Sequence, residues 1–124
     1  MPTIPKPLLH EALHAAAIEH LGGKVDYIQL YRSKYGKIVG GMTMAIPERY
    51  TYSREAYILQ APSLIGKNGS ASDAVDMANL PLQARLDALE RLQTDKDTLL
   101  TDANRIARHF QATGWYNTPQ GKTQ

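Results

Sequence analysis

The sequence predicts an α+β fold that is mainly helical, with an N-terminal helix, a small antiparallel β-hairpin or sheet and a C-terminal helical hairpin. Three stretches predict it: an Ala- and Leu-rich run at 9–20, two β-branched and aromatic runs at 25–31 and 37–46, and Leu-rich helical periodicity from residue 82. The 124 residues, 43% of them hydrophobic, suffice for one modest core. We expect a single domain over 1–113 and a tail over 114–124.

The first predicted helix contains the pattern H-E-x-x-H, formed by His10, Glu11 and His14, which is the signature of a zincin helix. Pro7 suits a first helical turn, and Gly22 and Gly23 end the run. Histidines four apart lie on one helix face and can bind one metal ion, with the adjacent Glu as general base. An Ala-rich helix carrying two surface histidines would show the same letters without a metal, so a third ligand has to decide.

His20 is the nearest candidate for a third ligand, but helix geometry excludes it. The metzincin pattern that its spacing suggests needs a glycine where this chain has Ala17, and nothing before Gly22 breaks the helix. At 1.5 Å per residue, His20 lies about 9 Å beyond His14 along the axis and about 120° around it. We expect a partly exposed residue at the helix C-terminus, where the dipole favours a protonated His.

Composition narrows the function classes. The net charge of +2 comes from interspersed acids and bases, which gives no case for nucleic acid. Cysteine is absent, so disulfides and thiolate metal sites are excluded and any metal must use His and carboxylate ligands. No apolar run approaches the roughly 20 residues of a membrane span, and residues 1–7 lack a signal-peptide core. We expect a cytoplasmic protein.

The two predicted strands form a hairpin around the polar turn at 32–36. Gly40 and Gly41 lie inside the second strand, which ends at Pro47. Such a glycine pair indicates a bulge or a close approach by another backbone. In a peptidase that backbone can be a substrate adding as an extra strand; a bulge without a ligand is the alternative.

Two shorter helices are expected next. Ser53 can cap a helix over 54–61, which should end before Pro62 and lead into a loop over 62–70. Gly66 and Lys67 in that loop do not complete a phosphate-binding motif, because Asn68 follows the lysine. Ser70 or Ser72 can cap the following helix, with Asp73 in its first turn, where an Asp ordinarily serves the helix dipole.

The C-terminal part predicts two helices. The first has Leu82, Leu86, Leu89 and Leu92 on one face, and Thr94-x-x-Asp97 resembles a capping box that starts another helix. The apolar face of the second helix consists of Leu99, Leu100, Ala103, Ile106, Ala107 and Phe110. We expect the pair to form an antiparallel hairpin over the N-terminal helix. The tail should be loosely ordered, with Trp115 and Tyr116 able to dock.

Several segments, taken in order, resemble the peptidase domain of FtsH-type (AAA-linked) zinc metalloproteases. His10-Glu11-Ala12-Leu13-His14-Ala15 is similar to the family's H-E-A-G-H-A, Gly23 to Ile28 to the strand that follows it, and Gly40-Gly41-Met42-Thr43 to L-G-x-T. Ile46 to Glu55 resembles the family's L-P-E-x-x-R-Y-x-Y segment, and Gly69-Ser70-Ala71-Ser72-Asp73 resembles G-A-x-N-D, whose Asp is the third zinc ligand. The likeness covers about Leu8 to Asp73 and is only general beyond.

This resemblance implies a zinc site formed by His10, His14 and Asp73, with Glu11 as general base. It also implies that a peptide or unfolded-protein substrate lies extended along Gly40, Gly41, Met42 and Thr43. The chain departs from the family at Leu13, at Ser72 and in a shorter segment between Leu59 and Asp73. It has no Walker motif, so we expect an ATP-independent zinc metallopeptidase, acting as a homo-oligomer or with a separate partner protein.

Two other interpretations stay open. One is a non-catalytic interaction or regulatory domain on the same scaffold, with or without zinc. The other is a helical binding module in which the motif is accidental, and it predicts no metal at all.

Overall fold

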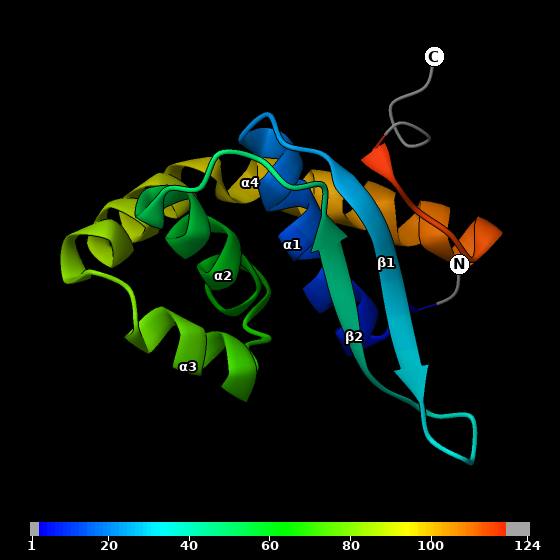
Figure 1. Cartoon of the computed structure of the whole chain (residues 1–124). Helices are drawn as coiled ribbons and strands as arrows, with labels where there is room; N and C mark the ends of the chain where they lie inside the picture. The colour runs from blue at the N-terminus through cyan, green and yellow to red at the C-terminus, as the bar shows by residue number, and fades with distance from the viewer. Residues whose placement is uncertain (1–2, 119–124) are drawn as a thin grey trace.

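The computed structural model describes residues 3–118. In chain order it contains α1 (Lys6–His20), β1 (Val25–Arg32), β2 (Ile38–Ala45), α2 (Tyr52–Gly66), α3 (Ala71–Ala78) and α4 (Leu82–Thr113). The β-hairpin covers one side of α1 while α2 and α4 pack on others, and α3 lies below α2 (Figure 1). The predicted α+β, mainly helical fold is confirmed. No helix in the described part is long and apolar enough to cross a membrane.

Helix α1 lies at the centre of the fold. Pro7 is in its first turn, and the chain leaves it through Gly22, whose φ of 84° favours glycine. Every residue from His10 to Glu19 is buried, because α2, α4 and both strands contact this helix. Its alanines have no bulk beyond Cβ and therefore allow the surrounding elements to approach closely. The helix thus carries its polar residues into the interior of the domain.

The β-hairpin is antiparallel, as expected, with Leu30 opposite Gly41. The ladder has two irregularities, and in one of them Val39 is the extra residue beside Gly40. The expected bulge is therefore present, next to the glycine pair. A Cβ on Gly41 would lie only 2.8 Å from Glu11 Cγ, so this glycine lets β2 approach α1.

Helix α2 differs from the prediction at both ends. Thr51 caps it instead of Ser53, with its hydroxyl accepting the Arg54 N–H at 3.1 Å. The helix also continues through Pro62 to Gly66, so the expected end at Ala61 is wrong. Pro62 is fully buried, which offsets the helix hydrogen bond lost at a proline. Of the two candidate caps for α3, Ser70 is the one used: it accepts the Asp73 N–H at 3.2 Å.

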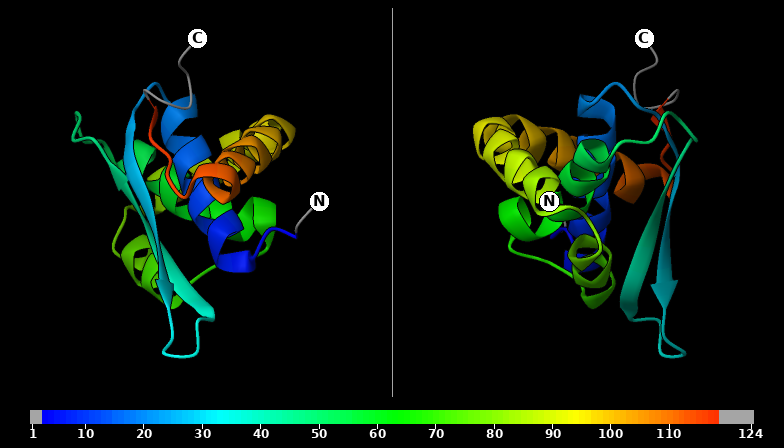
Figure 2. Two further views of the ribbon diagram at one scale, coloured as in Figure 1. Left: turned by 90° about the vertical axis from the view of Figure 1, so that its right-hand side faces the viewer. Right: turned by 60° about the vertical axis from the view of Figure 1, so that its left-hand side comes forward.

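Helix α4 is one continuous helix, so the break at Thr94 and the C-terminal helical hairpin are both wrong. Thr94 donates back to the Glu90 carbonyl, and no Gly or Pro interrupts residues 82–113. Leu82 and Leu86, expected on the apolar face, are 61% and 50% exposed. The helix packs against both α1 and α2 (Figure 2). Its buried residues are Ala84, Ala88, Leu92, Leu99, Ala103, Ile106 and Ala107.

The first residues after α4 pack against the domain. Tyr116 is fully buried, as expected for docking, and its hydroxyl donates to the Glu19 carboxylate. Thr118 donates to the same carboxylate at 2.8 Å and accepts the Val25 N–H at 2.6 Å. The expectation of loose order is therefore wrong for 116–118. Residues 119–124 of the expected tail, and the first two residues of the expected domain, lie outside the described part.

Candidate metal centre

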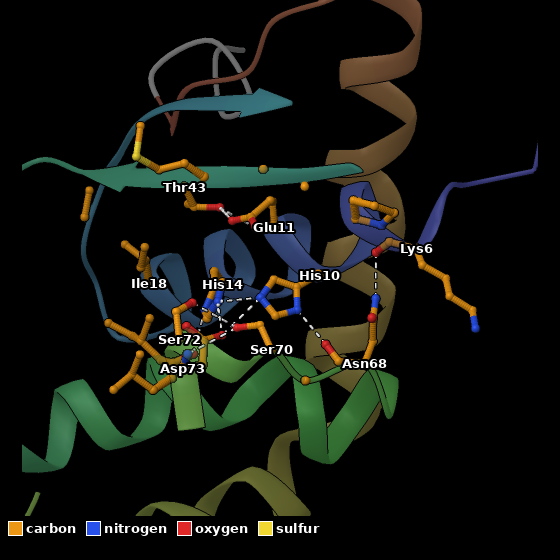
Figure 3. Close-up of a pocket in the computed structure, with 18 of the residues that line it drawn as sticks. Lys6, His10, Glu11, His14, Ile18, Thr43, Asn68, Ser70, Ser72 and Asp73 are labelled. Atoms are coloured by element: carbon orange, nitrogen blue, oxygen red, sulfur yellow. Dashed lines mark hydrogen bonds and ion pairs between the residues drawn. The ribbon is translucent and has the colours of Figure 1, made fainter. Parts of the chain in front are cut away.

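Three predicted ligands from two helices meet at one point. His10 and His14 project from the same face of α1, and Asp73 projects from the first turn of α3 (Figure 3). The Nε2 atoms of the two histidines are 3.1 Å apart, and Asp73 Oδ2 lies 3.0 Å from His10 Nε2 and 2.9 Å from His14 Nε2. Both histidines are buried and Asp73 is half-buried. The shorter segment before Asp73 therefore still brings it to the two histidines.

This donor triangle fits a zinc ion. Ligand atoms about 2.0–2.1 Å from a tetrahedral zinc lie about 3.3–3.4 Å from one another. The three observed separations, 2.9 to 3.1 Å, are slightly shorter than this. Two imidazoles and one carboxylate form a borderline-hard set that suits zinc and leaves a fourth position open.

Each ligand histidine donates a hydrogen bond from Nδ1 to a main-chain carbonyl, on the side of the ring away from Asp73. His10 Nδ1 donates to the Asn68 carbonyl at 2.5 Å, and His14 Nδ1 donates to the Ile58 carbonyl at 2.9 Å. A histidine that donates through Nδ1 presents Nε2 as the metal-binding atom. The two Nε2 atoms accordingly face each other and Asp73. The ring orientation needed for a metal is thus established by backbone contacts to α2 and the turn after it.

The charges of the three groups are coupled. Burial lowers the pKa of His10, but the hydrogen bond to Asp73 and further contacts outweigh burial, so the pKa is raised above its usual value. Burial alone would raise the pKa of Asp73, yet hydrogen bonds from His10 and His14 hold it well below the usual range. Asp73 is therefore a carboxylate at neutral pH, which is the form that binds a cation.

Glu11 lies in the same cavity, on the side toward β2 (Figure 3). It is 6% exposed, and the Thr43 hydroxyl lies 2.7 Å from its Oε1 and 2.9 Å from its main-chain oxygen. Its Oε2 makes no hydrogen bond within the described part of the chain. One oxygen of the carboxylate is thus held by a strand residue, and the other is left for a molecule in the cavity.

The cavity has a volume of about 660 Å³ and a strand along one wall. The residues proposed from the sequence to bind substrate, Gly40, Gly41, Met42 and Thr43, all line it. Within the described residues β2 pairs only with β1, so its other edge has unpaired main-chain groups. The structure therefore brings the predicted ligands, the predicted base and the predicted substrate strand to one cavity.

His20 lies away from this centre, as helix geometry indicated. Its Nε2 is 3.2 Å from Asp95 Oδ2 of α4, and its ring stacks on Tyr57. Sequence reasoning missed Ile58 and Asn68, because they act through main-chain carbonyls that leave no residue-type pattern. It named Thr43 through the strand motif but not the contact of this residue with Glu11.

No protein-family model matches the chain, and no curated protein matches its sequence. The chemistry of the site therefore rests on its own donor atoms and their arrangement.

Proposed function

We propose that this chain is an ATP-independent zinc metallopeptidase with an FtsH-like peptidase scaffold. The observation that carries the proposal is the convergence of His10, His14 and Asp73 to within 3.1 Å of one another, with Glu11 in the same cavity. His10 and His14 would hold the metal through Nε2, and Asp73 through Oδ2. Three protein ligands with an open fourth position are typical of catalytic zinc, whereas structural zinc is commonly closed by four.

Zinc bound there would supply Lewis acidity, which polarises a carbonyl oxygen and makes water more acidic. Glu11 would accept the proton of the attacking water at Oε2 and then deliver it to the leaving amine. Thr43 supports this role, because its hydroxyl holds the other oxygen of Glu11 and so fixes the plane of the carboxylate. Burial of Glu11 keeps bulk water from competing for the proton.

The substrate class follows from the strand beside the site. An extended peptide can pair with the open edge of β2, since main-chain groups there have no partner among the described residues. Gly40 and Gly41 present no side chains at this wall. Because the 124 residues contain no P-loop motif, we propose that substrates arrive as flexible peptides or already unfolded proteins. The absence of cysteine supports a reducing, cytoplasmic setting.

Substitution of the proposed base tests the proposal. The parent, Glu11→Gln and His14→Ala are assayed for zinc content by elemental analysis and for cleavage of a library of quenched unstructured peptides. We expect about one zinc per parent chain, zinc retained but cleavage reduced about 10²- to 10⁴-fold in Glu11→Gln, and zinc lost in His14→Ala.

Each departure from these results has a distinct meaning. Cleavage by Glu11→Gln at the parental rate would refute the role of Glu11. A parent that binds zinc but cleaves nothing would refute the peptidase and favour the non-catalytic interaction domain. A parent that binds no zinc, even when zinc is added, would refute the metal site.

A further inference from the structure

Helix α2 contains a proline at an interior position. In an α-helix the N–H of each residue donates to the carbonyl four residues earlier. Pro62 has no N–H, so the carbonyl of Ile58 loses its usual partner within the helix. A buried carbonyl without a partner is costly, which means that this oxygen must find a donor elsewhere.

The donor that it finds is a proposed metal ligand. His14 Nδ1 lies 2.9 Å from the Ile58 oxygen, although the two residues belong to different helices. This hydrogen bond needs a proton on Nδ1 of His14 and turns Nε2 toward His10 and Asp73. The missing amide hydrogen of Pro62 is therefore what leaves the Ile58 oxygen available to His14.

The second ligand is linked to the same turn of α2. The carbonyl of Pro62 accepts the Asn68 N–H at 3.1 Å, and the Asn68 carbonyl in turn accepts Nδ1–H of His10. Gly66 lets this end of α2 lie against α1, because a Cβ there would be 2.7 Å from Leu13 Cδ1. Pro62 itself is fully buried, so its place is fixed by packing. Both ligand histidines thus depend on carbonyls that this segment arranges.

We propose that Pro62 is a positioning residue of the metal centre, acting through the absence of its amide hydrogen. An N–H at position 62 would compete with His14 for the Ile58 oxygen and so weaken the contact that turns His14 Nε2 toward the proposed metal position. The proposal rests on the proposed zinc site, but its first readout does not require metal.

The experiment compares two substitutions that differ only in the N–H. Pro62→Ala introduces the amide hydrogen. Replacement of Pro62 by lactate through chemical ligation gives the same methyl group with an ester oxygen and no hydrogen. Pro81→Ala, at the start of α4, controls for loss of a proline away from the site. The Nδ1–H proton of His14 and its rate of exchange with solvent are read from ¹H–¹⁵N correlations in the metal-free protein, and zinc affinity is read from competition with a chromophoric chelator.

In the parent, in Pro81→Ala and in the lactate variant we expect a slowly exchanging Nδ1–H proton on His14 and similar zinc affinity. In Pro62→Ala we expect this proton to exchange faster with solvent and zinc affinity to weaken roughly 10- to 100-fold, as for loss of other contacts that orient a ligand. The parental exchange rate of the His14 Nδ1–H proton together with the parental zinc affinity in Pro62→Ala would overturn the proposal. If the alanine and lactate variants lost zinc affinity equally, the effect would come from removal of the buried proline ring and not from the added N–H.

Two results keep the test independent of stability and of the proposed function. If Pro62→Ala does not fold, the parent alone decides, because a metal-free parent without a protected Nδ1–H proton on His14 contradicts the inference. If the parent binds no zinc, the proposed function fails, while exchange of the His14 Nδ1–H proton in the metal-free variants still tests the role of Pro62.

Discussion

At the scale of single residues, one hydroxyl holds the proposed base. The Thr43 side chain lies 2.7 Å from Glu11 Oε1, and this contact determines how the carboxylate faces the cavity. Thr43→Val keeps the shape and removes the hydrogen bond. A hydrogen bond to a charged group contributes about 1.5–3 kcal/mol, so we expect kcat/KM on a cleaved peptide to fall roughly 10- to 100-fold with zinc content unchanged.

Thr43→Ser is the matched control, because it keeps the hydroxyl and should retain most of the activity. If the valine variant matched the parent, the contact would be structural only.

The same scale shows what residue patterns can and cannot predict about the site. His10, Glu11 and His14 could be named from the H-E-x-x-H pattern on a predicted helix, and Asp73 only from the resemblance of residues 69–73 to a family motif. The carbonyls of Ile58 and Asn68 could not be named, since every residue has a carbonyl and only the packing of α2 on α1 selects these two. Zinc, the role of Glu11 and peptide cleavage stay predictions.

At the scale of elements, the strand and the central helix touch through one glycine of a pair. A Cβ on Gly41 would lie 2.8 Å from Glu11 Cγ and 2.9 Å from the Gln29 oxygen, while the nearest atom to a Cβ on Gly40 is 3.9 Å away. We expect Gly41→Ala to lower the free energy of unfolding by about 1–3 kcal/mol through overpacking, and Gly40→Ala to leave it nearly unchanged. Urea denaturation of the two neighbouring variants measures the difference. Equal stabilities would show that β2 shifts freely relative to α1.

Element boundaries were predicted where local chemistry decides them and mispredicted where packing does. The ends of α1 follow from Pro7 and the glycines at 22 and 23, and the capping of α3 follows from Ser70. Pro62 and the Thr94 capping pattern are local signs of helix ends, but buried residues on both sides of each position hold the helices together. A capping residue without a preceding helix stop does not end a helix.

At the scale of the whole molecule, a buried acid joins distant parts of the chain. Glu19 of α1 accepts hydrogen bonds from Tyr116 and Thr118, and Arg105 of α4 lies 3.5 Å from its Oε1. Thr118 also accepts the Val25 N–H at the start of β1. These contacts hold the segment after α4 against the C-terminal end of α1. The fold class was predictable from periodicity. The contacts of Glu19 were not, because Tyr116 and Thr118 lie 97 and 99 positions away from it in the sequence.

The same contact predicts a dependence of stability on alkaline pH. Burial, followed by the hydrogen bond to Glu19, raises the pKa of Tyr116 above its usual value of about 10. A group whose pKa is raised in the folded state stabilises the protein fully below its unfolded pKa and loses that contribution as the pH rises through the folded pKa. We therefore expect the free energy of unfolding to fall above about pH 10.

Tyr116→Phe isolates this contribution. The variant should be less stable at neutral pH by about 1–3 kcal/mol, because one donor to a buried carboxylate is lost. Its stability should also fall less steeply than that of the parent between pH 9 and pH 11, with Tyr57, whose pKa is raised by burial and by Asp95, accounting for part of what remains. Parallel curves in urea denaturation would contradict the assignment.

The hydrogen bonds to Glu19 also bear on the order in which contacts can form during synthesis of the chain. The three proposed ligands all precede residue 74. Tyr116 and Thr118, which donate to Glu19, are synthesised later, among the last residues described. Until those residues are synthesised, Glu19 at the C-terminal end of α1 lacks two of its hydrogen-bond donors. The proposed metal ligands are therefore synthesised before the contacts that complete the fold around them can form.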